Sequence, residues 1–103
     1  MRRRKEQQVS DIVTAFLHET GLETQYLQYR IVQSWPEVVT DAVAALSYAL
    51  EVKGEVLWVG VKSPALASEL QMQKSQLVAR LNHLVGANII SDIRFTLQEV
   101  DKV

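Results

Sequence analysis

The sequence predicts a single α+β domain in which helices back a three-stranded sheet. Apolar residues recur at helical spacing before residue 45 and again over residues 64–85, and they alternate as in strands in between and afterwards. The 103 residues, of which 48% are hydrophobic, are enough for one modest core but not for two. No repeat or linker divides the chain. We therefore expect a basic arm at residues 1–8, the domain at residues 9–100 and a tail at residues 101–103.

Three helices are expected in the first half of the chain. The first ends at Gly21 and carries an apolar stripe of Val9, Ile12, Val13, Phe16 and Leu17. The second is expected over Leu22–Ser34, with one side formed by Leu22, Tyr26, Tyr29 and Val32. Pro36 suits the first turn of a new helix, which we place at Pro36–Ala44, with Trp35 at the corner.

A β-hairpin is expected next. The segments "SYALEV" and "EVLWVGV" flank a short turn at Lys53 and Gly54. In the second strand one face consists of Leu57, Val59 and Val61, and these aliphatic residues predict the core side. Trp58 then lies on the opposite face, where it is either covered by the N-terminal helices or exposed.

The stretch "VKSPALASELQMQKSQLVARLNHLVG" predicts one long helix. Ser63 caps it, Pro64 takes the first helical position and Gly86 ends it. Its apolar stripe consists of Leu66, Leu70, Leu77, Leu81, Leu84 and Val85. The segment "NIISDIRFTLQEV" then predicts a third strand. If this strand joins the second across the long helix, the unit is βαβ with a parallel, right-handed crossover.

The sequence lacks the residue patterns of common enzymes and metal sites. There is no cysteine, and neither His18 nor His83 has the i+4 histidine partner of a helical metal site. The four glycines are too far apart for a phosphate-binding loop. Serines and carboxylates lack the base and orienting group that activate a nucleophile. We therefore expect a protein that is not an enzyme, with no cofactor, no bound metal and no small-molecule substrate.

Membrane association is not expected either. No segment approaches the roughly 20 apolar residues of a membrane span. The basic start is not followed by the apolar run of a signal peptide. Together with the absence of cysteine, this predicts a cytoplasmic protein.

The net charge of -1 hides an asymmetry. Arg2, Arg3, Arg4 and Lys5 form a basic arm, whereas seven basic and twelve acidic side chains follow from Glu6 onward. An electrostatic contact with nucleic acid would therefore come mostly from the arm. The alternative is that the arm is a solvated terminus.

Several other residues are candidates for contacts with a partner. Trp35 is either a buried anchor between helices and sheet or an interface hot spot. Trp58, if exposed, is a platform for stacking or docking. Met72 falls off the apolar stripe, on a glutamine-rich surface that either receives a partner or faces solvent. Lys62 and Arg94 are the basic groups that would assist nucleic-acid binding near the sheet.

Three segments together resemble the DciA family, a group of bacterial proteins formerly catalogued as a domain of unknown function. They are "QSWPEVVTDAVAALS", "GEVLWVGVKSPALASEL" and "LNHLVGANIISDIRF". The most specific parts are Trp35 with the paired valines that follow, the pattern L-x-V-x-V-x-S-P-x-x-A-x-E-L from Leu57 to Leu70, and I-x-x-I-R-F from Ile90 to Phe95. The resemblance runs from about Ser10 to Leu97. The basic start and short length are similar to the compact versions found in the Bacteroidetes.

The resemblance implies a fold like the K-homology (KH) type and a role in loading the replicative helicase DnaB onto single-stranded DNA without ATP hydrolysis. This sequence departs from the pattern at Thr40, where the family usually has Gly. It also lacks the G-x-x-G loop with which KH domains bind the nucleic-acid backbone. We expect a non-enzymatic DNA-replication adaptor; the alternative is a stand-alone module that binds single-stranded DNA or RNA through sheet aromatics and basic groups.

Overall fold

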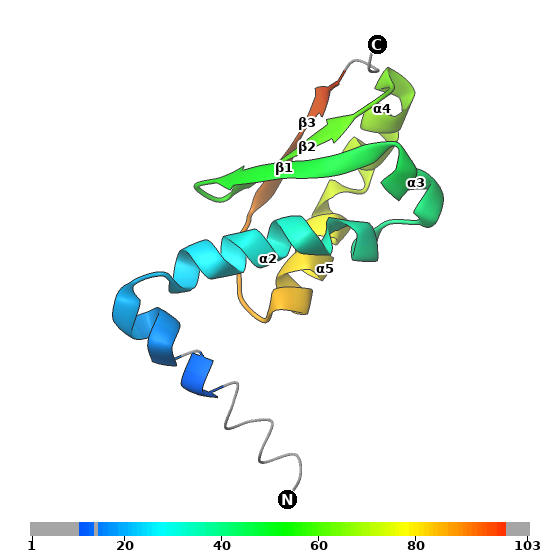
Figure 1. Ribbon diagram of the computed structural model, residues 1–103. Helices are drawn as coiled ribbons and strands as arrows, with labels where there is room; N and C mark the ends of the chain where they lie inside the picture. The colour runs from blue at the N-terminus through cyan, green and yellow to red at the C-terminus, as the bar shows by residue number, and fades with distance from the viewer. Residues whose placement is uncertain (1–10, 14, 99–103) are drawn as a thin grey trace, which may run out of the picture.

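The computed structural model describes residues 11–13 and 15–98. Residues 11–13 and 15–20 are helical, and the remaining elements are α2 (Glu23–Val38), α3 (Asp41–Ala45), β1 (Ser47–Lys53), β2 (Val56–Val61), α4 (Pro64–Met72), α5 (Lys74–Val85) and β3 (Asp92–Leu97). The predicted α+β class is confirmed (Figure 1). The expected basic arm and the tail lie outside the described residues.

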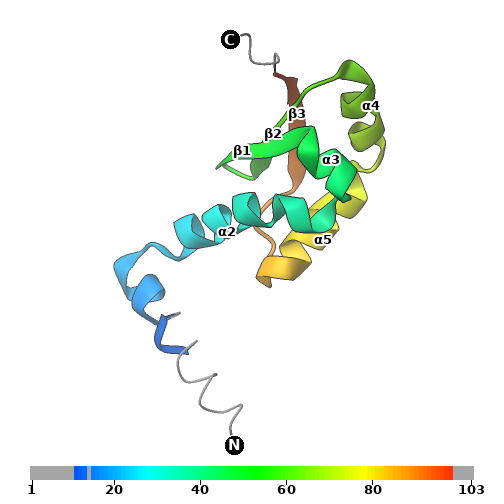
Figure 2. The same ribbon diagram turned by 45° about the vertical axis from the view of Figure 1, so that its right-hand side comes forward.

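The sheet has the order β1-β2-β3. β1 and β2 form the predicted antiparallel hairpin. β3 pairs in parallel with β2, so of the pairings that the sequence left open the structure has the βαβ connection through α4 and α5. The aliphatic face of β2 is the core side, as expected, because Leu57, Val59 and Val61 are all 0% exposed. α2 and α5 cover this face (Figures 1 and 2). The sheet is therefore covered by helices on one face.

The buried side of α2 differs from the prediction. The helix buries Ile31, Ser34, Trp35 and Val38, and Leu27 packs against this core. The predicted residues Leu22, Tyr26 and Tyr29 do share one face, but that face is exposed. α2 carries two apolar stripes at helical spacing, and the spacing alone does not indicate which of them packs on the sheet.

Trp35 anchors α2 to the sheet. Its side chain is 1% exposed, and its Nε1 donates a hydrogen bond to Ser47 Oγ at 3.0 Å. Ser47 Oγ in turn donates to the carbonyl oxygen of Val43 at 2.7 Å. The Trp35 ring also lies 6.4 Å from the ring of Phe95, centroid to centroid. One side chain thus joins α2 to β1 and β3.

The prediction of a separate helix starting at Pro36 is wrong. Pro36 lies inside α2, which continues for two residues to Val38. Pro36 cannot donate a bond to the carbonyl of Val32 and its ring crowds that carbonyl, and the helix ends two residues later. The next helix, α3, starts instead after Thr40, whose hydroxyl accepts a bond from the Val43 amide at 3.3 Å. The threonine that departs from the family pattern is therefore a helix cap.

The predicted long helix is also divided, at Gln73, into α4 and α5. Its ends are as expected: Ser63 Oγ accepts a bond from the Leu66 amide at 3.0 Å, and Gly86 is left-handed with a φ of 78°. No glycine or proline marks the break. Leu70 and Leu77, on either side of it, are both buried, so the apolar stripe packs on the core before and after the break.

Candidate interaction surfaces

The face of the sheet opposite α2 and α5 carries Trp58. In the strand register Trp58 lies between Glu51 of β1 and Arg94 of β3. The Trp58 side chain is half-buried, and the core contacts of the helices are all on the other face. The sequence leaves open whether the N-terminal helices cover this ring. In the described residues they do not, because α2 packs on the opposite side (Figure 1).

Opposite charges alternate around the Trp58 ring. Lys53 Nζ lies 5.9 Å from the ring centroid, within the range of a cation–π contact, and 3.5 Å from Glu51 Oε2. Arg94 Nε is 3.2 Å from Asp92 Oδ2. Each of these two cations therefore has a carboxylate beside it. A flat ring can stack on Trp58 at this surface. The positive charges that would attract phosphates are, however, largely neutralised by the neighbouring carboxylates.

Asp92 holds two basic residues at the edge of the sheet. Its Oδ1 is 2.9 Å from Lys74 Nζ at the start of α5. The hydrogen bond from Lys74 is the main cause that lowers the pKa of Asp92 below its usual value, and hydrogen bonds from Arg94 and from the Ile93 amide add to it against a smaller opposing effect of burial. The carboxylate thus joins α5 to β3 and restrains Arg94.

Gly60 makes room for a second aromatic ring on this face. A Cβ at this position would lie 2.6 Å from Gln98 Cγ and 3.2 Å from Tyr48 Cζ. The Tyr48 hydroxyl donates to Gln98 Oε1 at 3.1 Å, so the ring lies across the glycine. Tyr48 is 42% exposed. Together Trp58 and Tyr48 give the uncovered face of the sheet an aromatic character.

A second surface lies at the N-terminal end of the described chain. We call it the N-terminal apolar surface, and it consists of Ile12, Val13, Phe16, Leu22, Tyr26 and Tyr29, which are 39–68% exposed. The helical residues 11–13 and 15–20 extend away from the sheet and its helices in both views (Figures 1 and 2). Both stripes are evident in the sequence, but their exposure is not.

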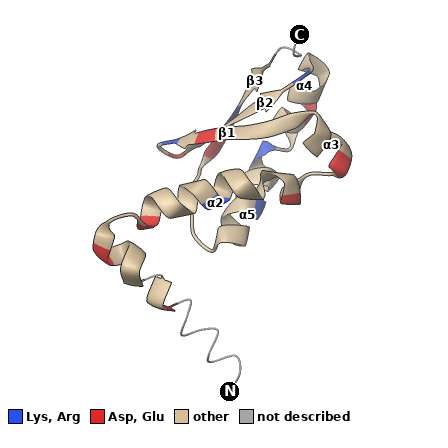
Figure 3. Ribbon diagram, viewed as in Figure 1, with Lys and Arg blue, Asp and Glu red and all other residues tan. Residues whose placement is uncertain are grey.

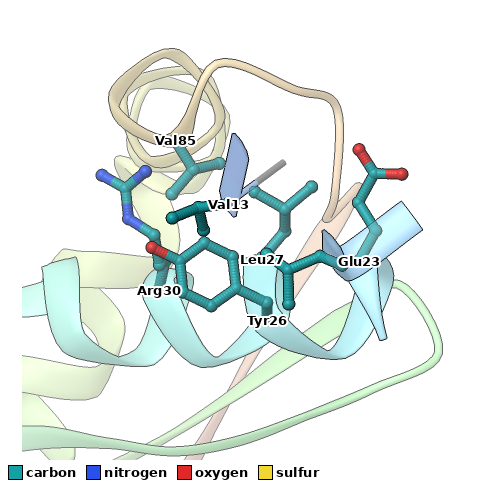
Figure 4. A pocket seen from close by; sticks show the side chains of 7 residues that line it. Val13, Glu23, Tyr26, Leu27, Arg30 and Val85 are labelled. Carbon is teal, nitrogen blue, oxygen red and sulfur yellow. The ribbon is translucent and has the colours of Figure 1, made fainter. Parts of the chain in front are cut away.

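The two halves of this surface meet at a hollow of about 260 Å³. Its lining includes Val13 and Leu17 from the first helical segment, Tyr26 and Leu27 from α2 and Val85 from α5. Figure 4 shows Val13 between Val85 and the ring of Tyr26. Glu23 and Arg30 also border the hollow. Side chains of the helical residues 11–13 and 15–20 thus face side chains of α2 and α5 across this hollow.

The remaining sequence candidates are scattered. Trp35 is in the core, where it cannot touch a partner in this conformation, whereas Met72 is 83% exposed at the junction of α4 and α5. Lys62 is exposed just after β2, and Arg94 lies beside Trp58. The arm, Arg2 to Lys5, lies outside the described residues. The structure thus brings together only Trp58 and Arg94 among the candidates it describes.

The described part of the chain offers no alternative site of a familiar chemical kind. It contains no group of three or more histidine, aspartate or glutamate side chains that could hold a metal ion. His18 is exposed, with Nδ1 at 3.4 Å from Glu23 Oε1, and His83 is exposed near the end of α5. None of the described helices combines the length and hydrophobicity needed to cross a membrane.

Comparison with known proteins gives the family. The family model described as "Dna[CI] antecedent, DciA" matches residues 8–95, which include all the described elements except the end of β3. The chain belongs to the DciA family. This family is associated with loading of the replicative helicase and is regarded as non-catalytic.

A curated relative supports the assignment at lower similarity. The DciA-family chain is 25% identical over 85 residues to a UPF0232 protein of Rhodococcus jostii strain RHA1. The match covers 82% of this chain but 45% of that relative. The chain therefore spans less than half the length of the relative it matches.

Proposed function

We propose that this protein is a non-enzymatic adaptor of DNA replication that binds the replicative helicase DnaB and assists its loading onto single-stranded DNA. The observation that carries the proposal is the family match over residues 8–95. The order of elements, with a three-stranded sheet backed by helices, is compatible with the KH-like fold that the resemblance implies. The surfaces described above suit binding rather than catalysis.

The adaptor would act by differential affinity. A protein that binds one conformation of the helicase ring, or its complex with DNA, more tightly than the others shifts the ring toward that state. Such a shift needs no nucleotide hydrolysis by the adaptor. Trp58 and the arm, Arg2 to Lys5, are the groups proposed to contact single-stranded DNA, and Met72 is a further candidate for contact with the helicase.

The test is calorimetric titration of the chain into the replicative helicase of its own host, with and without a single-stranded oligonucleotide. We expect micromolar or tighter binding, with an affinity that changes when DNA is present. A lack of heat at two temperatures, together with separate elution of the two proteins from a sizing column, would overturn the proposal.

A second candidate function is supported by the uncovered face of the sheet. Trp58 and Tyr48 on this face, with Lys53 and Arg94 nearby, form the kind of surface on which nucleobases stack. The protein would then be a stand-alone module for single-stranded DNA or RNA. The carboxylates that pair with both cations count against it, as does the lack of a G-x-x-G loop.

A further inference from the structure

Exposed apolar side chains are concentrated at one end of the molecule. Of the twelve large apolar side chains that are exposed in the described residues, six belong to the N-terminal apolar surface. They come from a stretch of the chain between Ile12 and Tyr29. Exposed apolar residues are ordinary when scattered, but a contiguous group on a soluble protein indicates a contact surface.

The group spans two helical segments that meet at the hollow. Val13 from the first helical segment and Tyr26 from α2 line the same hollow (Figure 4). Leu22, Tyr26 and Tyr29 follow the i, i+4, i+7 spacing, so they share one face of α2. The core does not require this face, because Leu27, Ile31 and Val38 already supply the packing of α2 on the sheet.

The charges around this surface are mostly negative. The sequence from Glu6 to Tyr29 contains four acidic residues and no lysine or arginine. Three of the four, Asp11, Glu19 and Glu23, are described, and they are spread along the first helical segment and the start of α2 (Figure 3). Arg30, which borders the hollow, is the first basic residue after the arm.

We infer that the N-terminal apolar surface docks on a protein partner that offers an apolar groove with lysine or arginine side chains at its rim. This inference rests on the proposed function, under which the partner is the replicative helicase. The recognition would be of the helix-in-groove type, with Phe16 and Tyr29 as apolar anchors and the acidic residues as the polar rim.

The charge pattern argues against the other occupants. Nucleic-acid phosphates and anionic lipid headgroups are repelled by an acidic rim. A second copy of this chain, packed symmetrically, would bring the same acidic residues face to face, because a two-fold contact uses the same patch on both copies. A basic-rimmed protein surface has neither disadvantage, and its charges complement those of Asp11, Glu19 and Glu23.

The first test removes an apolar anchor. Phe16→Ala and Tyr29→Ala each introduce alanine, which favours the helical conformation. Both original side chains are 59% exposed, so the fold should be retained. We expect each change to weaken binding to the helicase at least 10-fold, equivalent to about 1.4 kcal/mol. The matched control is Leu97→Ala, a side chain 56% exposed at the end of β3, which should change the affinity less than 2-fold.

The second test concerns the acidic rim. It measures how the affinity depends on salt concentration, which a simple loss of structure would not change in the same way. The affinity of the unchanged chain for the helicase should fall as salt rises, because complementary charges are screened. Glu19→Lys should weaken binding at low salt and flatten this dependence. The matched control is Glu37→Lys, on an exposed residue near the end of α2, which should leave the dependence unchanged.

The outcomes separate this inference from the proposed function. If the unchanged chain does not bind the helicase, the proposed function fails and the inference fails with it. If the unchanged chain binds and the Phe16 and Tyr29 variants bind equally well, only the inference is overturned. The inference would also be overturned if the unchanged chain formed a dimer that Phe16→Ala dissociates. The same holds if the chain bound single-stranded DNA or anionic vesicles and Phe16→Ala abolished that binding. Either result would assign the surface to another occupant.

Discussion

Replacing Ser47 by alanine should destabilise the domain because it leaves the buried indole N–H of Trp35 without a hydrogen-bond acceptor. Ser47 is 5% exposed, and its Oγ is the acceptor for Trp35 Nε1 at 3.0 Å. The other bond made by this hydroxyl, to the Val43 carbonyl, is not critical, because that carbonyl also accepts from the Leu46 amide at 3.0 Å. The loss is therefore confined to one buried donor.

The structure sets the magnitude of this loss. A buried donor left without a partner costs about 1–3 kcal/mol. A shallow hollow bordered by Trp35 and Ser47 lets water approach the vacated position, so we expect the lower part of the range, about 1–2 kcal/mol. In a domain of this size each kcal/mol lowers Tm by roughly 4–8 °C.

Urea unfolding followed by far-ultraviolet circular dichroism measures this cost. The control is Ser68→Ala on an exposed position of α4, which should change the free energy of unfolding by no more than about 0.5 kcal/mol. In a Trp35→Phe background there is no indole donor to be left without a partner. Ser47→Ala should then lower the free energy of unfolding by at least about 0.5 kcal/mol less than in the unchanged chain, which is the usual coupling between contacting residues. An equal cost in both backgrounds would refute the assigned role of this hydrogen bond.

Three further predictions concern the surface groups. Trp58→Ala should weaken single-stranded DNA binding by about 1–3 kcal/mol if bases stack on the sheet, as a filter or fluorescence titration would show; unchanged affinity would exclude the second candidate function. Replacing Arg2 to Lys5 by alanine should reduce the slope of log K against log salt for single-stranded DNA by at most about 3, since each phosphate neutralised contributes roughly 0.7 and the arm has four charges. An unchanged slope would exclude the arm from DNA binding. Asp92→Asn should lower stability at neutral pH by no more than about 1 kcal/mol, since Lys74 and Asp92 are 30% and 28% exposed. Because the folded pKa of Asp92 is lowered, this difference should be present above the ordinary carboxyl pKa of about 4 and should vanish as pH falls through the folded value; a constant difference down to pH 2 would contradict it.

Local signals in the sequence were sufficient for the core face of β2 and for the two outer ends of the α4–α5 segment. Alternation placed Leu57, Val59 and Val61 in the core, and the Ser63-Pro64 pair and Gly86 marked the ends of the α4–α5 segment, because strand faces and caps depend on a few neighbouring residues. The break at Gln73 has no such signal. Leu70 and Leu77 are seven residues apart and would share one face of an unbroken helix as well, so their burial alone does not explain the break.

The candidate surfaces were predicted unevenly for a similar reason. Period-two alternation places Trp58 on the face opposite the core, and the structure adds which charges surround it. In α2 the sequence offers two stripes, and packing alone decides that Ile31 and Trp35 are inside while Tyr26 and Tyr29 are outside. An amphipathic helix needs one apolar face for its core. A second apolar face on the same helix therefore indicates a contact surface. The helical period alone does not show which of the two faces is the core face.

The two surfaces are compatible with simultaneous contacts. The N-terminal apolar surface lies partly on α2 and borders α5 at Val85, whereas Trp58 lies on the face of the sheet that these helices leave uncovered (Figure 1). The layer of α2 and α5 therefore separates them, and a protein bound at the first leaves the second open to solvent. Under the proposed function, Trp58→Ala should leave the affinity for the helicase alone unchanged and reduce it only when single-stranded DNA is present. A loss of affinity without DNA would place Trp58 in the protein contact, and the two surfaces would then have to act as one.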